Sequence, residues 1–107
     1  MPEEIVDLLA QRFRVLSEPM RIKILDALKD GESTVGDLTV RLGASQQNVS
    51  KHLGVLHQAG LVRRSKERTY VHYEIADPSV FDLCEQVCGG VRQQIHHLDQ
   101  ILTGDPA

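Results

Sequence analysis

The sequence is poor in aromatic residues and cysteine and has no long apolar segment, and each scarcity excludes a class of protein. Tryptophan is absent, and the two tyrosines and two phenylalanines make up 4% of the chain, which leaves little material for a large ligand pocket. No apolar run approaches the roughly 20 residues that span a bilayer. The start MPEEIVD lacks the basic and apolar regions of a signal peptide, so we expect a cytoplasmic protein with no membrane contact.

Patterns typical of enzymes are also missing. The chain has no Ser-His-Asp order, no phosphate-binding loop and no paired carboxylates. Cys84 and Cys88 have the spacing Cys-x3-Cys, whereas redox motifs have Cys-x2-Cys. Two cysteines four residues apart in one helix do not easily bond to each other, and a reducing cytosol keeps them as thiols. We therefore expect a protein that is not an enzyme.

The composition is that of a single globular domain covering residues 1–107, with 41% apolar and 25% charged residues. The net charge of -3 is unevenly distributed. Residues 41–72 contain six basic residues and one acid, a net charge of +5, which leaves -8 for the rest. Such asymmetry is typical of nucleic-acid binding, although a solvated basic surface has the same pattern.

Two amphipathic helices are predicted at the N-terminal end. Residues 3–16 carry apolar residues at helical spacing. A second helix begins at Pro19, after the capping residues Ser17 and Glu18, because proline fits the first turn of a helix. It is expected to end near Gly31. The residues that it is expected to bury are Met20, Ile24, Leu25 and Leu28.

A helix-turn-helix is predicted next. Thr34 and Asp37 resemble a capping box at the start of a short helix that ends at Gly43. Ser45 then caps a helix that ends at Gly60. Because only residues 43–45 separate these two helices, the pair forms a helix-turn-helix motif.

The second helix of this motif presents an unusual set of polar side chains. In SQQNVSKHLGVLHQAGLV, Val49, Leu53 and Leu56 share one face. His52 lies at the edge of that face, where we expect it to pack or bond locally. The front end of the helix carries hydrogen-bonding side chains on another face, namely Gln46, Gln47, Ser50 and Lys51. Side chains of this kind donate to and accept from base edges in the major groove.

The period changes after Gly60. A short strand is predicted over Leu61–Arg64 and a half-buried strand over 70–75, joined by a polar tip at Lys66–Arg68. Asp77-Pro78 ends this hairpin, and a helical stripe follows over residues 79–102. The predicted fold is therefore mainly α with a small β-hairpin, in the order helix, helix, helix, helix, hairpin, long helix.

The long last helix predicts a homodimer. Its apolar stripe continues for about six turns, more than a small domain needs for its own core. We therefore expect the helices at 3–16 and 79–102 to pack across a two-fold axis. The expected interface residues are Leu9, Phe13, Val80, Cys84, Val87, Val91, Ile95 and Leu98.

Three segments resemble the ArsR/SmtB family of bacterial winged helix-turn-helix regulators. LSEPMRIKILDAL resembles the second-helix signature of that family, SQQNVSKHLGVLHQAGLV its recognition helix, and RTYVHYEI its wing strand. The resemblance implies a dimeric repressor that binds a pseudo-palindromic operator in double-stranded DNA and leaves it when an effector binds. The expected DNA-binding residues are Ser45, Gln46, Gln47, Ser50 and Lys51 in the helix and Arg63, Arg64, Lys66 and Arg68 in the hairpin.

The chain departs from the metal sites that the resemblance implies. The thiolate site of the family needs Cys-x-Cys in the helix corresponding to Val35–Leu42, which has no cysteine. The other site begins with Asp-x-His, but here Ser79 replaces the histidine, and the later ligand positions fall on Gly90 and Gln93. Only Asp77 matches, so we do not expect a zinc site of that pattern.

The remaining candidates for a sensor are Cys84, Cys88, His96 and His97. The cysteines share a helix face and could bind a soft ion such as arsenite, Cd(II) or Cu(I) if a partner helix adds a ligand. They could equally be oxidised or persulfidated, or could pack as small apolar residues. The histidines are either a polar helix flank or ligands of nickel or zinc.

Two alternatives to an effector-controlled repressor stay open on the sequence alone. One is a winged-helix interaction module whose basic face binds an acidic protein. The other is a regulator without a small-molecule sensor.

Overall fold

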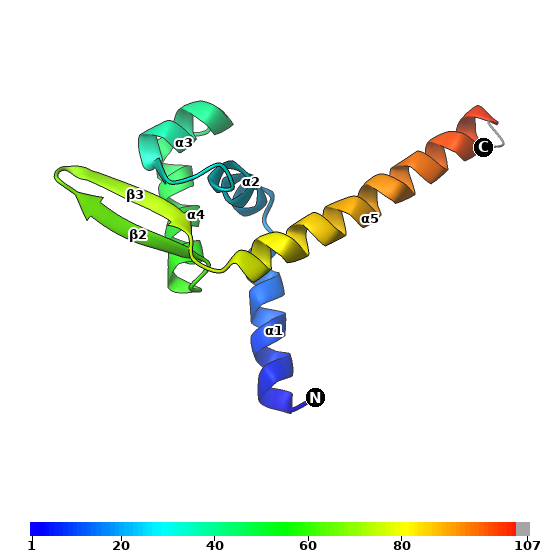
Figure 1. The fold of residues 1–107 in the computed structure, drawn as a ribbon, viewed down its shortest axis with the longest axis horizontal. Helices are drawn as coiled ribbons and strands as arrows, with labels where there is room; N and C mark the ends of the chain where they lie inside the picture. The colour runs from blue at the N-terminus through cyan, green and yellow to red at the C-terminus, as the bar shows by residue number, and fades with distance from the viewer. Residues whose placement is uncertain (105–107) are drawn as a thin grey trace. The chain divides into compact units, whose positions relative to one another are not determined.

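The computed structural model describes residues 1–104 (Figure 1). The elements are α1 (Glu3–Leu16), α2 (Pro19–Leu28), β1 (Ser33–Thr34), α3 (Val35–Leu42), α4 (Gln46–Gln58), β2 (Val62–Glu67), β3 (Tyr70–Ile75) and α5 (Pro78–Thr103). The chain divides into two compact units. The first comprises residues 1–77, and the second begins at Pro78 and contains α5. None of the helices within residues 1–104 combines the length and apolar character needed to cross a bilayer.

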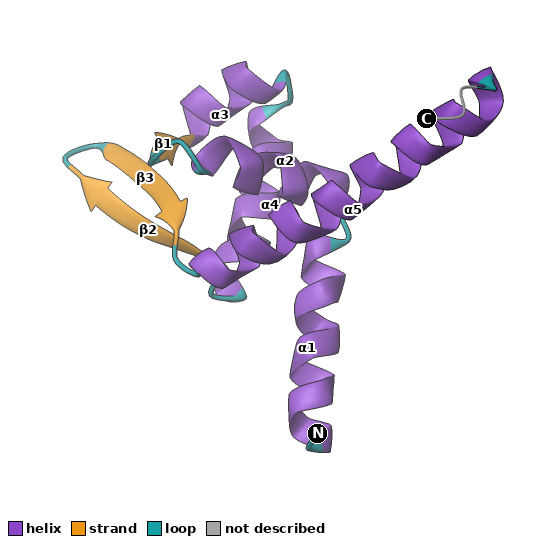
Figure 2. Ribbon diagram, turned by 45° about the vertical axis from the view of Figure 1, so that its right-hand side comes forward, coloured by secondary structure: helices purple, strands orange, loops and turns teal. Residues whose placement is uncertain are grey.

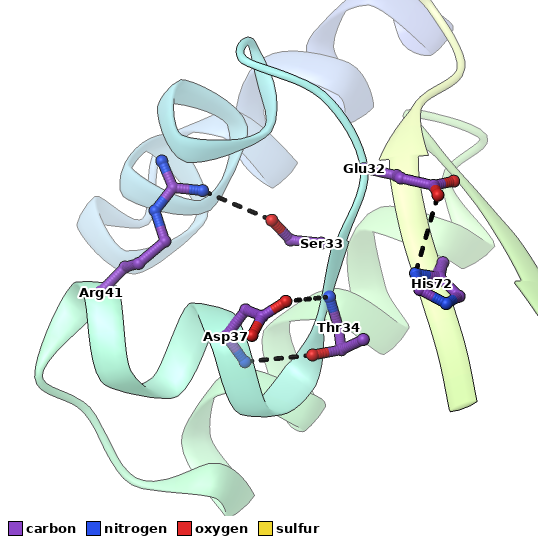
Figure 3. Close-up of polar contacts among 6 residues, drawn as sticks. All are labelled: Glu32, Ser33, Thr34, Asp37, Arg41 and His72. Atoms are coloured by element: carbon purple, nitrogen blue, oxygen red, sulfur yellow. Dashed lines mark hydrogen bonds and ion pairs between the residues drawn. The ribbon is translucent and has the colours of Figure 1, made fainter. Parts of the chain in front are cut away.

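The local signals that define the helix-turn-helix are confirmed. The backbone N–H of Asp37 donates to Oγ1 of Thr34 at 3.1 Å, and the Asp37 carboxylate accepts from the Thr34 N–H at 3.5 Å, which completes the capping box (Figure 3). Gly43 ends α3 in the left-handed conformation, with φ of 62°. Ser45 caps α4, since its Oγ accepts from the N–H of Asn48 at 3.1 Å. One expected cap differs, because the residue before α2 is Glu18, which makes no side-chain capping bond.

The strands form an antiparallel three-stranded sheet, in which β3 lies between β1 and β2 (Figure 2). The sequence predicted only the hairpin of β2 and β3. The additional strand β1 pairs Ser33 with Tyr73. The hairpin register runs from Val62 opposite Ile75 to Glu67 opposite Tyr70. Strand β2 is therefore longer than the predicted Leu61–Arg64, and the turn lies one to two residues later than the predicted tip.

The core of the first unit is formed by α2, α3, α4 and the inner face of the sheet. Helices α2, α3 and α4 contact one another, and β2 contacts α4. Met20, which was predicted to be buried, is half-buried. The largest fully buried side chains are Ile24, Leu38, Leu53, Leu56, Leu61 and Val49.

Helix α5 is 26 residues long and carries many exposed apolar side chains. It extends the predicted helix 79–102 by one residue at each end. Val80, expected at a dimer interface, is buried in the single chain, and Cys84 is half-buried. Six other expected interface residues are exposed, namely Leu9, Phe13, Val87, Val91, Ile95 and Leu98.

Candidate nucleic-acid interface

The front end of α4 presents an exposed polar face. Val49, Leu53 and Leu56 are fully buried on one side of the helix. Because 3.6 residues make a turn, this burial directs the polar residues of the first turn and a half outward. The exposed residues are Ser45, Gln46, Gln47, Ser50 and Lys51. No acid lies in the first turn, so the partial positive charge of the helix N-terminus and the Lys51 ammonium together favour an anionic partner.

Gly54 continues this face one turn further along α4. It is exposed, and a Cβ added there would meet no atom within 4 Å. Nothing in the single chain therefore requires a glycine at this position. The missing side chain instead leaves the α4 backbone open to close approach by a partner.

The basic side chains of the hairpin fall into two groups. Arg63 Nη1 lies 2.9 Å from Glu74 Oε1 on the facing strand, so this pair neutralises its charge locally. Arg64, Lys66 and Arg68 are exposed and form no ion pair within residues 1–104. We therefore assign the free positive charge of the hairpin to these three side chains.

Arg68 occupies the turn between β2 and β3 in the left-handed conformation, with φ of 59°. This conformation costs a residue with a Cβ roughly 1–2 kcal/mol, and glycine adopts it without that cost. Arg68 therefore places a positive charge at the tip of the hairpin at a cost in local backbone energy.

Arg41, which also contributes to the basic segment, has acidic and polar neighbours in the structure. Its Nη1 donates to Oγ of the buried Ser33 at 3.3 Å, and its Nη2 lies 3.5 Å from Asp30 Oδ2. Figure 3 shows that the guanidinium extends from α3 toward Ser33 at the start of β1. Arg41 is therefore a connection between α3 and the preceding loop. In the same region, His72 Nδ1 lies 3.8 Å from Glu32 Oε1.

His52 was expected to pack or bond locally at the edge of the buried face of α4, but it is buried and bonds to another helix. The residue is 7% exposed, and its Nδ1 accepts a hydrogen bond from Nε of Arg21 on α2 at 3.1 Å. The same guanidinium donates through Nη1 to the carbonyl oxygen of Val15 at 3.1 Å. Arg21 could not be predicted from the sequence as a partner of His52, because no local pattern links two residues 31 positions apart.

Comparison with known proteins identifies the family. The family model for the bacterial regulatory proteins of the arsR family matches residues 18–64. The transcriptional repressor SdpR of Bacillus subtilis (strain 168) is 35% identical over 63 residues, which are 59% of this chain and 70% of SdpR. This chain belongs to the ArsR family. The matched residues 18–64 contain the helix-turn-helix formed by α3 and α4.

Two further similarities extend the assignment to the ArsR family. A protein of Streptomyces lividans named as a probable mercury resistance operon repressor is 36% identical over 77 residues, 72% of this chain and 62% of that protein. The homodimeric winged helix-turn-helix DNA-binding domain Mb0332 of Mycobacterium bovis has a TM-score of 0.79 at 29% identity, and the match covers 88% of this chain and 87% of that one. The chain is therefore a winged helix-turn-helix transcriptional regulator.

The residues that correspond to the metal site of the ArsR family do not form one here. Asp77, the only matching ligand, accepts through Oδ2 from Arg12 Nη1 at 2.7 Å. Within residues 1–104 no group of three or more His, Cys, Asp or Glu side chains is arranged to hold a metal ion.

The two cysteines of α5 are free thiols with different surroundings. Cys84 is half-buried, and burial followed by the negative charge of Glu85 raises its pKa. Cys88 is exposed. His96 and His97 are exposed as well, and since a helix rises 1.5 Å per residue, His96 lies about 12 Å beyond Cys88 along the axis. The histidines therefore cannot share one ion with the cysteines of the same chain.

Proposed function

We propose that the chain acts in the cytoplasm as a dimeric repressor that places α4 of each copy in successive major grooves of a pseudo-palindromic operator. The exposed polar front end of α4 carries this proposal. A helix of this kind enters the major groove with its N-terminal residues foremost, and half-sites lie roughly 34–36 Å apart along the duplex. The two-fold symmetry of a dimer matches an operator with inverted half-sites.

The polar residues of α4 divide between bases and phosphates. Gln46 and Gln47 lie in the first turn and present amides that bond in a bidentate manner to adenine N6 and N7. Ser50 and Lys51, one turn later, contact bases or phosphates. Ser45 has its Oγ engaged as an acceptor in the cap, and its hydroxyl proton remains available to a phosphate.

The hairpin supplies affinity that does not depend on sequence. Arg64, Lys66 and Arg68 contact flanking phosphates or the minor groove, and each neutralised phosphate adds to the salt dependence of binding. Arg63 contributes less, because Glu74 already pairs with it.

The dimer explains the exposed apolar side chains of α1 and α5. Phe13 is 53% exposed and Ile95 61% exposed in the single chain. Exposed apolar side chains in such number on a small protein mark an interface. The homodimeric relative Mb0332 supports a second copy of this chain as the partner.

A selection experiment tests the proposal. The protein is incubated with a pool of randomised duplexes, and the bound duplexes are recovered and sequenced over several cycles. We expect enrichment of one sequence with two inverted half-sites. A protein that used its basic face to bind an acidic protein would enrich no sequence, and this outcome would reject the proposed function.

We further propose that the repressor leaves its operator when a thiol-directed effector reacts with Cys84 and Cys88. The two thiols are one helical turn apart on the same face of α5, so a soft ion that prefers sulfur can reach both. The similarity to a mercury resistance operon repressor supports this class of effector. The raised pKa of Cys84 disfavours its thiolate, so the more exposed Cys88 reacts first.

Titration of the protein–operator complex tests this release. Mercury(II), arsenite or hydrogen peroxide is added to the wild-type complex and to complexes of Cys84→Ser and Cys88→Ser. We expect at least one reagent to release wild-type protein and to act more weakly on both variants. Equal release from all three proteins would assign the effect to another site, and no release by any reagent would leave a regulator without a thiol sensor.

A further inference from the structure

Arg12 connects α1 with the end of α4 and with the residue that precedes α5. Its Nη1 donates to Asp77 Oδ2 at 2.7 Å, and its Nη2 lies 3.5 Å from the carbonyl oxygen of Ala59. Ala59 is the residue that ends α4, and Asp77 is the last residue of the first unit. One guanidinium on α1 therefore binds acceptors that are 47 and 65 residues away in sequence.

The chemistry of this contact requires arginine. Only a planar guanidinium presents two N–H groups that reach a carboxylate and a carbonyl oxygen at once, whereas a lysine ammonium acts as a single point charge. The side chains of Arg12 and Asp77 are 39% and 28% exposed, so water covers the pair only in part. Arg14, two residues later on the same helix, is exposed and makes no side-chain bond within residues 1–104.

We propose that Arg12 is a positioning residue that fixes the tilt of the recognition helix α4 relative to the dimerisation helix α1, and thereby selects operators by the spacing of their half-sites. This inference rests on the proposed function, because it needs a dimer on two half-sites. The contact holds the C-terminal end of α4, opposite to the end that carries Gln46 and Gln47.

Because α4 is rigid, a small tilt at its C-terminal end displaces its N-terminal end. Helix α4 has 13 residues and is therefore about 20 Å long. A tilt of about 10° at Ala59 moves the front end of α4 by about 3.5 Å, close to the roughly 3.4 Å step between adjacent bases of a strand. Since the dimer repeats the displacement at both half-sites, loss of the contact widens the range of half-site spacings that the protein binds.

The test compares operators that differ only in spacing. The duplex sequence enriched by wild-type protein is prepared with its native spacing and with one or two base pairs added to or removed from the centre. Binding is measured for wild type, Arg12→Ala, Arg12→Lys and the control Arg14→Ala, together with the dimer dissociation constant and the thermal midpoint of each protein.

We expect Arg12→Ala to lose about tenfold or more in affinity for the native spacing and little for the altered spacings, so that its preference flattens. Arg12→Lys keeps one acceptor and should lie between, which also covers the case in which Arg12→Ala folds poorly. Arg14→Ala should keep the wild-type preference. The proposal is wrong if Arg12→Lys and Arg12→Ala both keep the full preference for the native spacing. It is also wrong if both variants lose the same factor in affinity on every spacing and have a lower thermal midpoint, because that result indicates a purely structural contact. If wild type enriches no duplex, the proposed function itself fails and the positioning role fails with it.

Discussion

Arg21 of α2 donates a hydrogen bond of 3.1 Å from Nε to Nδ1 of His52 on the recognition helix. An imidazole accepts at Nδ1 only when it is neutral with its proton on Nε2. Burial is the main cause that lowers the pKa of His52, the charges of Arg21 and Lys51 lower it further, and Glu18 opposes them. The hydrogen bond between α2 and α4 therefore requires an uncharged His52.

This pairing predicts a loss of stability in mild acid. Because the pKa of His52 is below its ordinary value of 6.5 in the folded protein, the unfolded chain binds the proton first as the pH falls. The contribution of His52 is complete above pH 6.5 and decreases below it. Urea unfolding at pH 7.5 and pH 5.5 should show a lower free energy of unfolding at pH 5.5.

The variant His52→Asn separates this effect from other titrating groups. An asparagine Oδ1 can accept the Arg21 bond at the position of Nδ1 and does not titrate. We expect the difference in stability between the two pH values to be smaller in His52→Asn. An unchanged difference would show that His52 does not cause it.

The hairpin arginines should differ in their effect on DNA binding. Arg64 carries a free charge, so Arg64→Ala should weaken binding on all sequences and reduce the slope of log K against log salt by about 1. The double variant Arg63→Ala with Glu74→Ala removes an internal ion pair without a change in net charge, and its slope should stay that of wild type. Salt titrations of both proteins on one duplex measure these slopes. Equal slopes would contradict the distinction between the paired Arg63 and the unpaired Arg64.

Gly54→Ala should affect stability and binding in opposite directions. An alanine in place of an exposed mid-helix glycine stabilises a helix by roughly 0.5–1 kcal/mol, and its Cβ meets no atom of the chain within 4 Å. If DNA approaches the α4 backbone at this position, the added methyl group lowers the affinity for the operator. Thermal unfolding and operator titration of the same variant check both signs, and unchanged affinity would place Gly54 outside the interface.

The helix-turn-helix could be predicted from the sequence because its signals are local. The Thr34–Asp37 box, the stop at Gly43 and the Ser45 cap each depend on residues within three or four positions, and the structure confirms all three. The helical spacing of the apolar residues of α4 is equally local, so this spacing predicted the exposure of Gln46 and its neighbours.

The contacts that connect elements could not be predicted from local pattern. Strand β1 has only two residues, and it exists because β3, about 40 positions later, pairs with it. The bonds of Arg12 and Arg21 join residues that are 31 to 65 positions apart. The basic count of residues 41–72 also gave no indication that Arg41 and Arg63 would pair with acids.

The front end of α4 carries the proposed contacts to DNA bases. Their most direct test is the affinity of the double variant Gln47→Ala with Lys51→Ala for the selected operator at fixed salt. One lost bidentate base contact is worth roughly 1–3 kcal/mol, and a lost phosphate contact adds to it, so the loss should be about tenfold to several hundredfold. Gln58→Ala, at the opposite end of the same helix, should bind like wild type. Wild-type affinity in the double variant would contradict the assignment of α4 to the major groove.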